Sequence, residues 1–210
     1  MNAIFRIDGR NVETRPDAAG PWSPTMQHGS APASLVTWAA ENIPTAVPMQ
    51  VARVTIDLMR PVPVAPLTFE TNVLREGRKI QLCEVRLLAG DVLVVRATVL
   101  KIRRERQSLP SDIADVPVTL PGPGDSRPIE AKFSSSPFTS AVAMHAARGD
   151  FGVPGPGAIW YRVIRPMVEG ASVSQAVRAV VAADLCNGTS AALDFRQWNF
   201  LNADLPVSMA

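Results

Sequence analysis

The chain has 210 residues, of which 47% are hydrophobic and 19% are charged, a composition typical of a folded globular protein with a sizeable core. Its formal net charge is only +2, and no clustered basic face of the kind that binds nucleic acid is evident. No apolar run reaches the roughly 18 residues of a membrane helix, and charges stand where a signal peptide needs its apolar stretch. We therefore expect a cytoplasmic protein with no nucleic-acid or membrane partner.

Metal and disulfide chemistry are not indicated. The two cysteines, Cys83 and Cys186, stand far apart, which excludes a disulfide scaffold and a cysteine-based zinc site. Two histidines without a dense carboxylate cluster do not make a metal site. We expect neither a metal nor another cofactor.

The first half predicts one helix followed by a run of strands. Ser30 can cap a helix over residues 31–42, which Pro44 ends. Apolar and polar residues then alternate over 53–58, and three more strands are predicted, separated by turn residues. These are residues 67–75, 79–89 and 91–102. One helix followed by an antiparallel meander predicts a sheet wrapped against that helix.

A proline-rich segment separates this half from the next. Residues 107–132 hold five of the 19 prolines and two glycines, and they follow neither hydrophobic period, as in an extended linker. The predicted organisation is therefore an N-terminal domain over 1–106, a linker over 107–132 and a C-terminal domain over 133–210.

The second half starts the same plan again. A strand is predicted over 159–165, and residues 172–175 have the serine and glutamine spacing of a capping box. The helix over 173–186 places four valines and Asp184 on one stripe. A strand from about residue 195 to residue 208 follows.

A weak internal repeat relates the two halves. Residues 202–205 (NADL) match residues 55–58 (TIDL) at the same place after the helix, which puts Glu41 at or near the position of Asp184. A carboxylate on a valine-lined helix face is unusual. Desolvation would raise the pKa of Asp184 and make it a base near neutral pH. The alternative is a structural carboxylate bonded to the backbone or to an arginine. Glu41 has a less apolar stripe, and we expect it to be solvated.

Six short segments stand out as motifs. They are residues 28–30 (HGS), 55–63 (TIDLMRPVP), 74–79 (LREGRK), 160–162 (WYR), 165–170 (RPMVEG) and 183–188 (ADLCNG). Together they resemble the motifs of the tandem hotdog acyl-CoA thioesterases of the medium-chain thioesterase II type. The resemblance implies an α+β double hotdog, in which each half packs a long helix on an antiparallel sheet. It also implies acyl-CoA as the substrate, hydrolysed to free acid and CoA without a covalent nucleophile.

The resemblance assigns roles to particular residues. Asp184 corresponds to the residue that orients or deprotonates water, and Asn202 stands where the family has Thr or Ser to hold that water. The turn at His28 and Gly29 and the helix start at Ser30 would lie across the interface from Asp184, where free N–H groups polarise the thioester oxygen. Otherwise His28 is a surface-loop histidine and Asn202 a simple strand residue. The family's late-strand glutamine has no counterpart in this sequence.

Three functions remain open. The first is hydrolysis of acyl-CoA, and the second is a catalytically silent acyl-CoA-binding or assembly role on the same fold. The third is hydration of an enoyl thioester, which related hydratases perform with an Asp and a His close in sequence. No histidine lies near Asp184 in the sequence, so the third is the least favoured.

The second hotdog is expected to be incomplete. After Asp57 the first half continues through three strands to Arg106, whereas few residues follow the matching Asp204. Missing strands leave an uncovered sheet edge that invites pairing with another chain. We therefore expect either a longer natural protein or a homo-oligomer, and poor hydrolysis by the chain alone.

Overall fold

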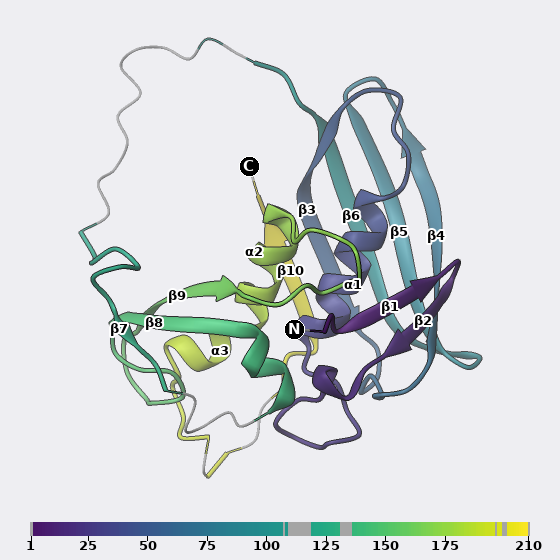
Figure 1. Cartoon of the computed structure of the whole chain (residues 1–210). Helices are drawn as coiled ribbons and strands as arrows, with labels where there is room; N and C mark the ends of the chain where they lie inside the picture. The colour runs from purple at the N-terminus through teal and green to yellow at the C-terminus, as the bar shows by residue number, and fades with distance from the viewer. Residues whose placement is uncertain are drawn as a thin grey trace.

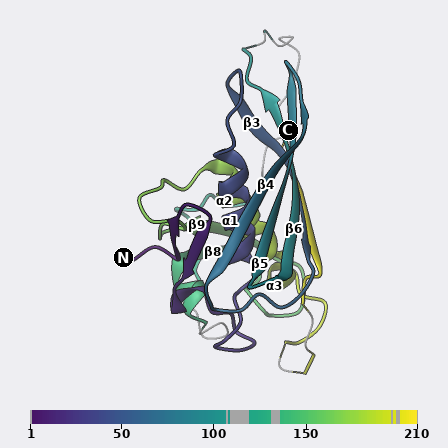
Figure 2. The same cartoon turned by 90° about the vertical axis from the view of Figure 1, so that its right-hand side faces the viewer.

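Two antiparallel helices lie side by side at the centre of the fold. α1 (Ser30–Glu41) packs against α2 (Gln175–Asp184), and both lie on one face of a large sheet (Figures 1 and 2). The computed structural model describes residues 2–106, 108, 119–130, 136–195, 197–198 and 201–209. The helices predicted over 31–42 and 173–186 are both present.

The large sheet has seven antiparallel strands in the order β1-β2-β4-β5-β6-β3-β10. Its four long central strands lie where alternation and turn residues predict them. β4, β5 and β6 form the expected meander, but β3 pairs with β6 and not with β4, the next strand in the chain. The strands are β1 (Phe5–Asp8), β2 (Asn11–Thr14), β3 (Met49–Leu58), β4 (Leu67–Glu76), β5 (Ile80–Ala89), β6 (Val92–Arg103) and β10 (Asp204–Ser208).

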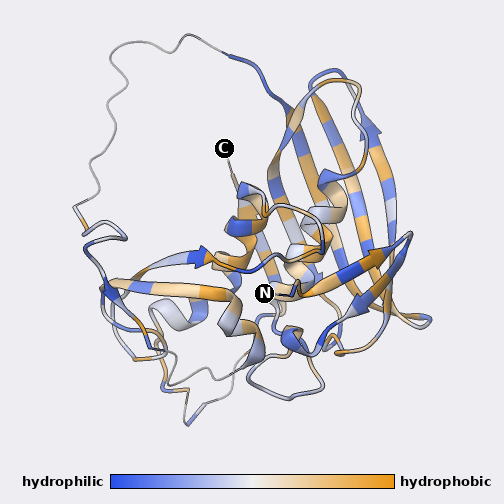
Figure 3. Cartoon of the chain, in the orientation of Figure 1, coloured by the Kyte–Doolittle hydropathy of each residue, from blue (hydrophilic) through white to orange (hydrophobic). Residues whose placement is uncertain are grey.

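Side-chain alternation decides which face of this sheet covers α1. In β5 the buried residues Cys83, Val85 and Leu87 alternate with more exposed ones, and Figure 3 shows the corresponding change of hydropathy along the strands. The outward face is charged, with Arg96 Nε 2.7 Å from Glu84 Oε1. Almost every residue of α1 is buried. The helix is therefore a core element rather than an amphipathic surface helix.

The remaining elements form a smaller layer beside α2. Three strands pair in the order β7-β8-β9, and a short helix follows α2 (Figure 1). These elements, with the two 3-10 turns, are β7 (Arg127–Pro128), β8 (Val142–Arg148), β9 (Ala158–Val163), α3 (Cys186–Thr189), η1 (Pro16–Ala18) and η2 (Pro137–Ala141).

β10 joins the two halves of the chain by pairing with β3. Asp204 lies opposite Asp57, and Leu205 lies opposite Ile56. The repeat makes Asp57 and Asp204 equivalent residues. When equivalent residues lie opposite each other in an antiparallel pair, a local two-fold axis between them relates the two strands. The register therefore agrees with the repeat, although the two sheets differ in size among the described residues.

Three details differ from the sequence-based expectations. Ser30 is not a cap: it is the first residue of α1, and its side chain makes no capping bond. Ser174, not Ser172, caps α2, since its hydroxyl accepts from Val177 N. The strand expected over 195–208 is shorter, because β10 begins only at Asp204.

The predicted linker is described only in part. Residues 107, 109–118 and 131–132 lie outside the described residues. Two residues within its predicted span, Arg127 and Pro128, form β7 and pair with β8. The division into domains at 106 and 133 stays a prediction.

Candidate active site

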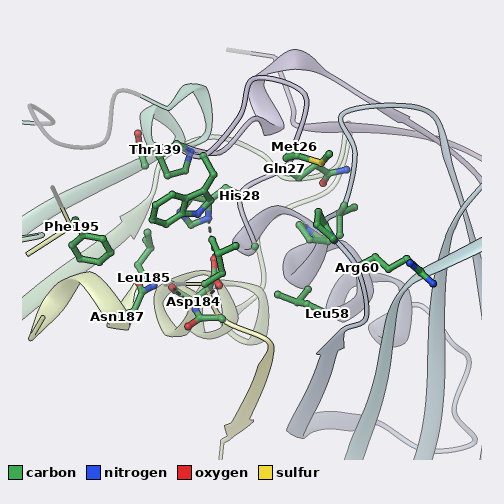
Figure 4. A pocket seen from close by; sticks show the side chains of 18 of the residues that line it. Met26, Gln27, His28, Leu58, Arg60, Thr139, Asp184, Leu185, Asn187 and Phe195 are labelled. Atoms are coloured by element: carbon green, nitrogen blue, oxygen red, sulfur yellow. Dashed lines mark hydrogen bonds and ion pairs between the residues drawn. The ribbon is translucent and has the colours of Figure 1, made fainter. Parts of the chain in front are cut away.

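A cavity of about 630 Å³ lies where the start of α1 meets the end of α2 (Figure 4). Side chains from both halves of the chain line it, and most of them are apolar, as is typical of small-molecule sites. The lining includes Trp22, Met26, His28, Gly29, Pro32, Leu58, Met59, Arg60, Val62, Thr139, Phe151, Asp184, Leu185, Asn187, Phe195, Leu201 and Asn202.

Asp184 is the buried anion of this cavity, with only 6% of its surface exposed. Its Oδ2 atom accepts a hydrogen bond from Ser30 Oγ at 2.9 Å and lies 3.0 Å from His28 Nδ1. Its Oδ1 atom accepts from Asn202 Nδ2 at 2.9 Å. Three polar side chains from two separate segments of the chain therefore converge on one carboxylate.

These donors overturn the expected direction of the pKa shift. Burial by itself raises the pKa of Asp184, but the hydrogen bond and charge of His28, together with the bonds from Asn202 and Ser30, outweigh it. The pKa of Asp184 therefore lies below its ordinary value. The prediction of a raised pKa was wrong because desolvation was considered without the donors that stabilise the charged form.

His28 contributes its side chain as well as its backbone. The imidazole stacks on Phe138 with ring centroids 4.9 Å apart and an interplanar angle of 19°, and only 12% of the side chain is exposed. It is therefore not a surface-loop histidine. The expectation that no histidine stands near Asp184 is correct along the sequence but does not hold in space.

One backbone N–H group at the start of α1, that of Gly29, has no acceptor among the described residues, and Gly29 lines the cavity. His28 N donates to Ala18 O at 2.9 Å, so it is not one of the free N–H groups predicted there. No described residue accepts from Gly29 N. A Cβ atom on Gly29 would lie 2.6 Å from Asp184 Oδ1, so only glycine lets the carboxylate approach this backbone.

The structure brings together all five sequence-predicted site residues. His28, Gly29, Asp184 and Asn202 line the cavity, and Ser30 is bonded to Asp184 behind it. The roles proposed for these residues stay predictions.

Sequence reasoning missed the apolar lining and Arg60. Trp22 and Phe151 come from segments with no recognisable period, and Phe195 was expected only as the start of a strand, so nothing in the sequence distinguished them as lining residues. Arg60 lies within the matched segment 55–63, which was the one available signal.

The other end of the helix pair holds Glu41, which was expected to be solvated. It is half-buried and accepts a hydrogen bond from Ser174 Oγ at 2.8 Å. Burial raises the pKa of Glu41 above its ordinary value, and the Ser174 bond and the charge of Lys101 oppose this only in part. The expectation of a solvated carboxylate was therefore wrong.

The described residues contain neither a metal-binding cluster nor a membrane-spanning helix. No group of three or more histidine, cysteine, aspartate or glutamate side chains there could hold a metal ion. No helix in the described part of the chain is long and apolar enough to cross a membrane.

Comparison with solved structures defines the class of fold. A hotdog-fold protein from Alicyclobacillus acidocaldarius superposes with a TM-score of 0.61 at 21% identity over 76% of this chain and 60% of its own. A candidate thioesterase II from Thermobifida fusca gives 0.66 at 16% identity, over 96% of this chain and 77% of its own. For a candidate thioesterase from Novosphingobium aromaticivorans the values are 0.64, 18%, 89% and 75%. The expected hotdog fold is thus confirmed.

The family is indicated by the N-terminal half. Residues 18–102 match the acyl-CoA thioesterase N-terminal domain, so this segment of the chain is similar to that domain. The resemblance seen in the motifs of this half is confirmed. No curated protein matches the chain.

Proposed function

We propose that this protein hydrolyses acyl-CoA thioesters to free acid and CoA with a water molecule activated at Asp184. The observation that carries the proposal is the buried Asp184 carboxylate, held by His28, Ser30 and Asn202 beside the free Gly29 N–H in an apolar cavity. A thioester carbonyl needs a positioned water, a base and a polarised oxygen, and this arrangement supplies all three.

The reaction needs no covalent nucleophile. Water adds to the thioester carbonyl carbon and gives up a proton, while Gly29 N–H donates to the oxygen that becomes negative. Collapse breaks the carbon–sulfur bond, and the proton passes to the departing sulfur. Among the described residues that line the cavity there is no serine or cysteine. Ser30 is fully buried and already bonded to Asp184.

The lining fits an acyl-CoA substrate. Its apolar part, which includes Leu58, Met59 and Leu201, suits a fatty acyl chain. Arg60 is exposed at this cavity, points away from Asp184 in Figure 4, and forms no ion pair with any described residue. A free guanidinium there is suited to a phosphate group of CoA. Homo-oligomerisation and a cytoplasmic location stay predictions.

Hydration of an enoyl thioester is the second candidate function. It was the least favoured because no histidine follows Asp184 closely in sequence, but His28 Nδ1 lies 3.0 Å from the Asp184 carboxylate. The same Asp–His pair could add water to a carbon–carbon double bond next to the thioester. Hydrolysis is preferred because the matched family is a thioesterase family.

One assay separates the candidates. Saturated acyl-CoAs of several chain lengths and a 2-enoyl-CoA are offered, and thiol release and loss of the enoyl absorbance are followed in parallel. Hydrolysis predicts thiol release from the saturated substrates, and hydration predicts loss of enoyl absorbance without thiol. Tight binding without either signal would identify a silent acyl-CoA-binding protein and overturn the proposal.

The variant that tests the site is Asp184→Asn. We expect turnover to fall at least about a hundredfold with the fold intact by circular dichroism. Glu41→Gln, at the other end of the helix pair, is the matched control and should keep near-normal turnover. A folded Asp184→Asn variant with normal turnover would remove Asp184 from the mechanism.

A further inference from the structure

The wall of the cavity beside α3 is a phenylalanine ring that rests on a glycine. Phe151 is half-buried and lines the cavity, and Gly188, within α3, is buried behind the ring. A Cβ atom added at Gly188 would lie 2.5 Å from two ring atoms of Phe151, Cε2 and Cζ. Carbon atoms in contact stay about 3.5–4.0 Å apart. A side chain at residue 188 and the present position of the ring therefore exclude each other.

The backbone itself does not require a glycine at residue 188. Gly149 and Gly152, on either side of Phe151, have positive φ angles of +69° and +73°, but Gly188 does not. Gly188 lies in a helical segment, where alanine is more favourable than glycine. What requires glycine at this position is the close approach of the Phe151 ring.

Backbone contacts on both sides hold the ring in this place. Gly152 N donates to Gly188 O at 2.7 Å, which ties the residue after Phe151 to α3. On the other side, Phe151 N donates to Asp150 Oδ1 at 2.8 Å. Asp150 Oδ2 in turn lies 3.0 Å from Arg127 Nη2 of β7. The ring is therefore a fixed wall of the cavity.

This wall stands on the side of the cavity that an acyl chain would occupy. In Figure 4, Asp184 lies between Arg60 and Asn187, the residue before Gly188. Arg60 suits a phosphate group of CoA, and the thioester carbonyl would lie at Asp184. The acyl chain would then leave Asp184 on the side of α3, where the Phe151 ring lines the cavity.

We propose that Phe151 and Gly188 together set the length of the acyl chain that this protein accepts. This inference rests on the proposed function, in which acyl-CoA is the substrate. Phe151 is the end wall, and Gly188 is the positioning residue that lets the ring lie back against α3. Because the ring lies between Gly188 and the cavity, a side chain at residue 188 pushes the ring into the space for the chain. One methylene group more or less in an apolar pocket changes kcat/KM by roughly tenfold or more.

The first test is Gly188→Ala, assayed with a series of saturated acyl-CoAs. We expect kcat/KM for the longest chain that the wild type hydrolyses to fall on the order of tenfold, with less than about threefold change for the shortest. Gly124→Ala is the matched control and should keep the wild-type profile, because a Cβ atom there meets no atom within 4 Å and its φ angle is not positive. An equal loss at every chain length in Gly188→Ala would overturn the inference.

The second test removes the far end of the ring. In Phe151→Leu we expect the longest accepted chain to become longer, and adding Gly188→Ala to this variant should have no further effect on chain length. A wild-type profile in Phe151→Leu would overturn the inference. So would a shift toward shorter chains by Gly188→Ala that persists without the ring.

Binding separates a failure of this inference from a failure of the proposed function. Alkyl-CoA thioethers of increasing length cannot be hydrolysed as thioesters are, and calorimetry gives their dissociation constants. We expect affinity to rise with chain length up to a limit, and Gly188→Ala to reach that limit at a shorter chain than the wild type. This result without thiol release from any acyl-CoA would overturn the proposed hydrolysis and leave the inference standing. The same limit in both proteins would overturn the inference even if thioesters are hydrolysed.

Discussion

The two ends of the α1–α2 pair are built from the same parts. At one end Ser30 Oγ, at the start of α1, donates to Asp184, the last residue of α2. At the other end Ser174 Oγ, at the start of α2, donates to Glu41, the last residue of α1. Each end therefore joins a serine at a helix start to a carboxylate at a helix end.

The surroundings make the two ends different. Gly29 precedes Ser30 and lets the Asp184 carboxylate approach the backbone, whereas Val173 precedes Ser174. Ser174 also accepts from Val177 N and so caps α2. At the Glu41 end Lys101 Nζ donates to the carbonyls of Ala40 and Ile43 at 2.9 and 2.8 Å. The Asp184 end opens into the cavity, whereas at the Glu41 end the hydrogen bond from Ser174 connects the two helices.

The difference teaches that burial alone does not decide the state of a carboxylate, because the donors around it determine whether desolvation is offset. Asp184 is nearly fully buried, yet three donors bring its pKa below the ordinary value. Glu41 is less buried, but one serine and a lysine do not offset its desolvation, and its pKa is raised. The four predictions below extend the contrast already drawn between Asp184→Asn and Glu41→Gln.

The largest loss of turnover is expected at Gly29, the residue before Ser30. In Gly29→Ala the new Cβ would lie 2.6 Å from Asp184 Oδ1, so the carboxylate must move. A displacement of about 1 Å can cost roughly a hundredfold in rate, and we expect a loss of turnover of that size. Val173→Ala is the control and should leave turnover within about twofold. Normal thiol release by Gly29→Ala would contradict the close approach described here.

A smaller effect is expected when Ser30 loses its hydroxyl. Ser30→Ala removes one of the two contacts to Asp184 Oδ2 but leaves the contact with His28. Since a hydrogen bond to a charged group is worth about 1.5–3 kcal/mol, we expect turnover to fall on the order of tenfold, measured as kcat. The corresponding Ser174→Ala change should not alter kcat. Equal kcat values for Ser30→Ala and Ser174→Ala would show that the serines at the two ends of the helix pair contribute equally to catalysis.

Ser174→Ala should instead lower stability. It removes the N-cap of α2, which costs about 1 kcal/mol in typical helices, measured as the free energy of unfolding in urea. Ser172→Ala is the matched control, because Ser172 is exposed and outside the cap, and it should change stability by less than about 0.5 kcal/mol. If Ser172→Ala lowered the free energy of unfolding by more than Ser174→Ala, Ser172 would be the N-cap of α2, as the capping box in the sequence predicts.

The smallest effect is a contrast in pH dependence. The lowered pKa of Asp184 means that its contribution to stability is present above its ordinary value of 3.8 and is lost as pH falls through the folded pKa. The raised pKa of Glu41 means that its contribution is present below 4.5 and is lost as pH rises through the folded pKa.

Unfolding measured from acid to neutral pH checks this contrast. As pH rises, Asp184→Asn should lose stability relative to the wild type, and Glu41→Gln should gain it. Differences of the same sign for both variants would show that the two carboxylates are held alike.

Much of the fold follows from local patterns. Alternation and turn residues located β3 to β6, and Gly90, with φ of +58°, occupies the β5–β6 turn where it was expected. The valine stripe located α2 and singled out Asp184. These features could be predicted because side-chain period and turn chemistry report on residues that are neighbours in the chain.

Only the tertiary structure decided how Asp184 is held. Its partners Ser30 and His28 lie more than 150 residues earlier in the chain, and no local period encodes such a contact. The same distance hid the role of Ser30, which binds Asp184 instead of capping α1. The sequence determined that an acidic residue would be buried at the end of α2. The direction of its pKa shift depended on donors that only folding brings within 3 Å, because hydrogen bonding is short-ranged while sequence patterns describe burial alone.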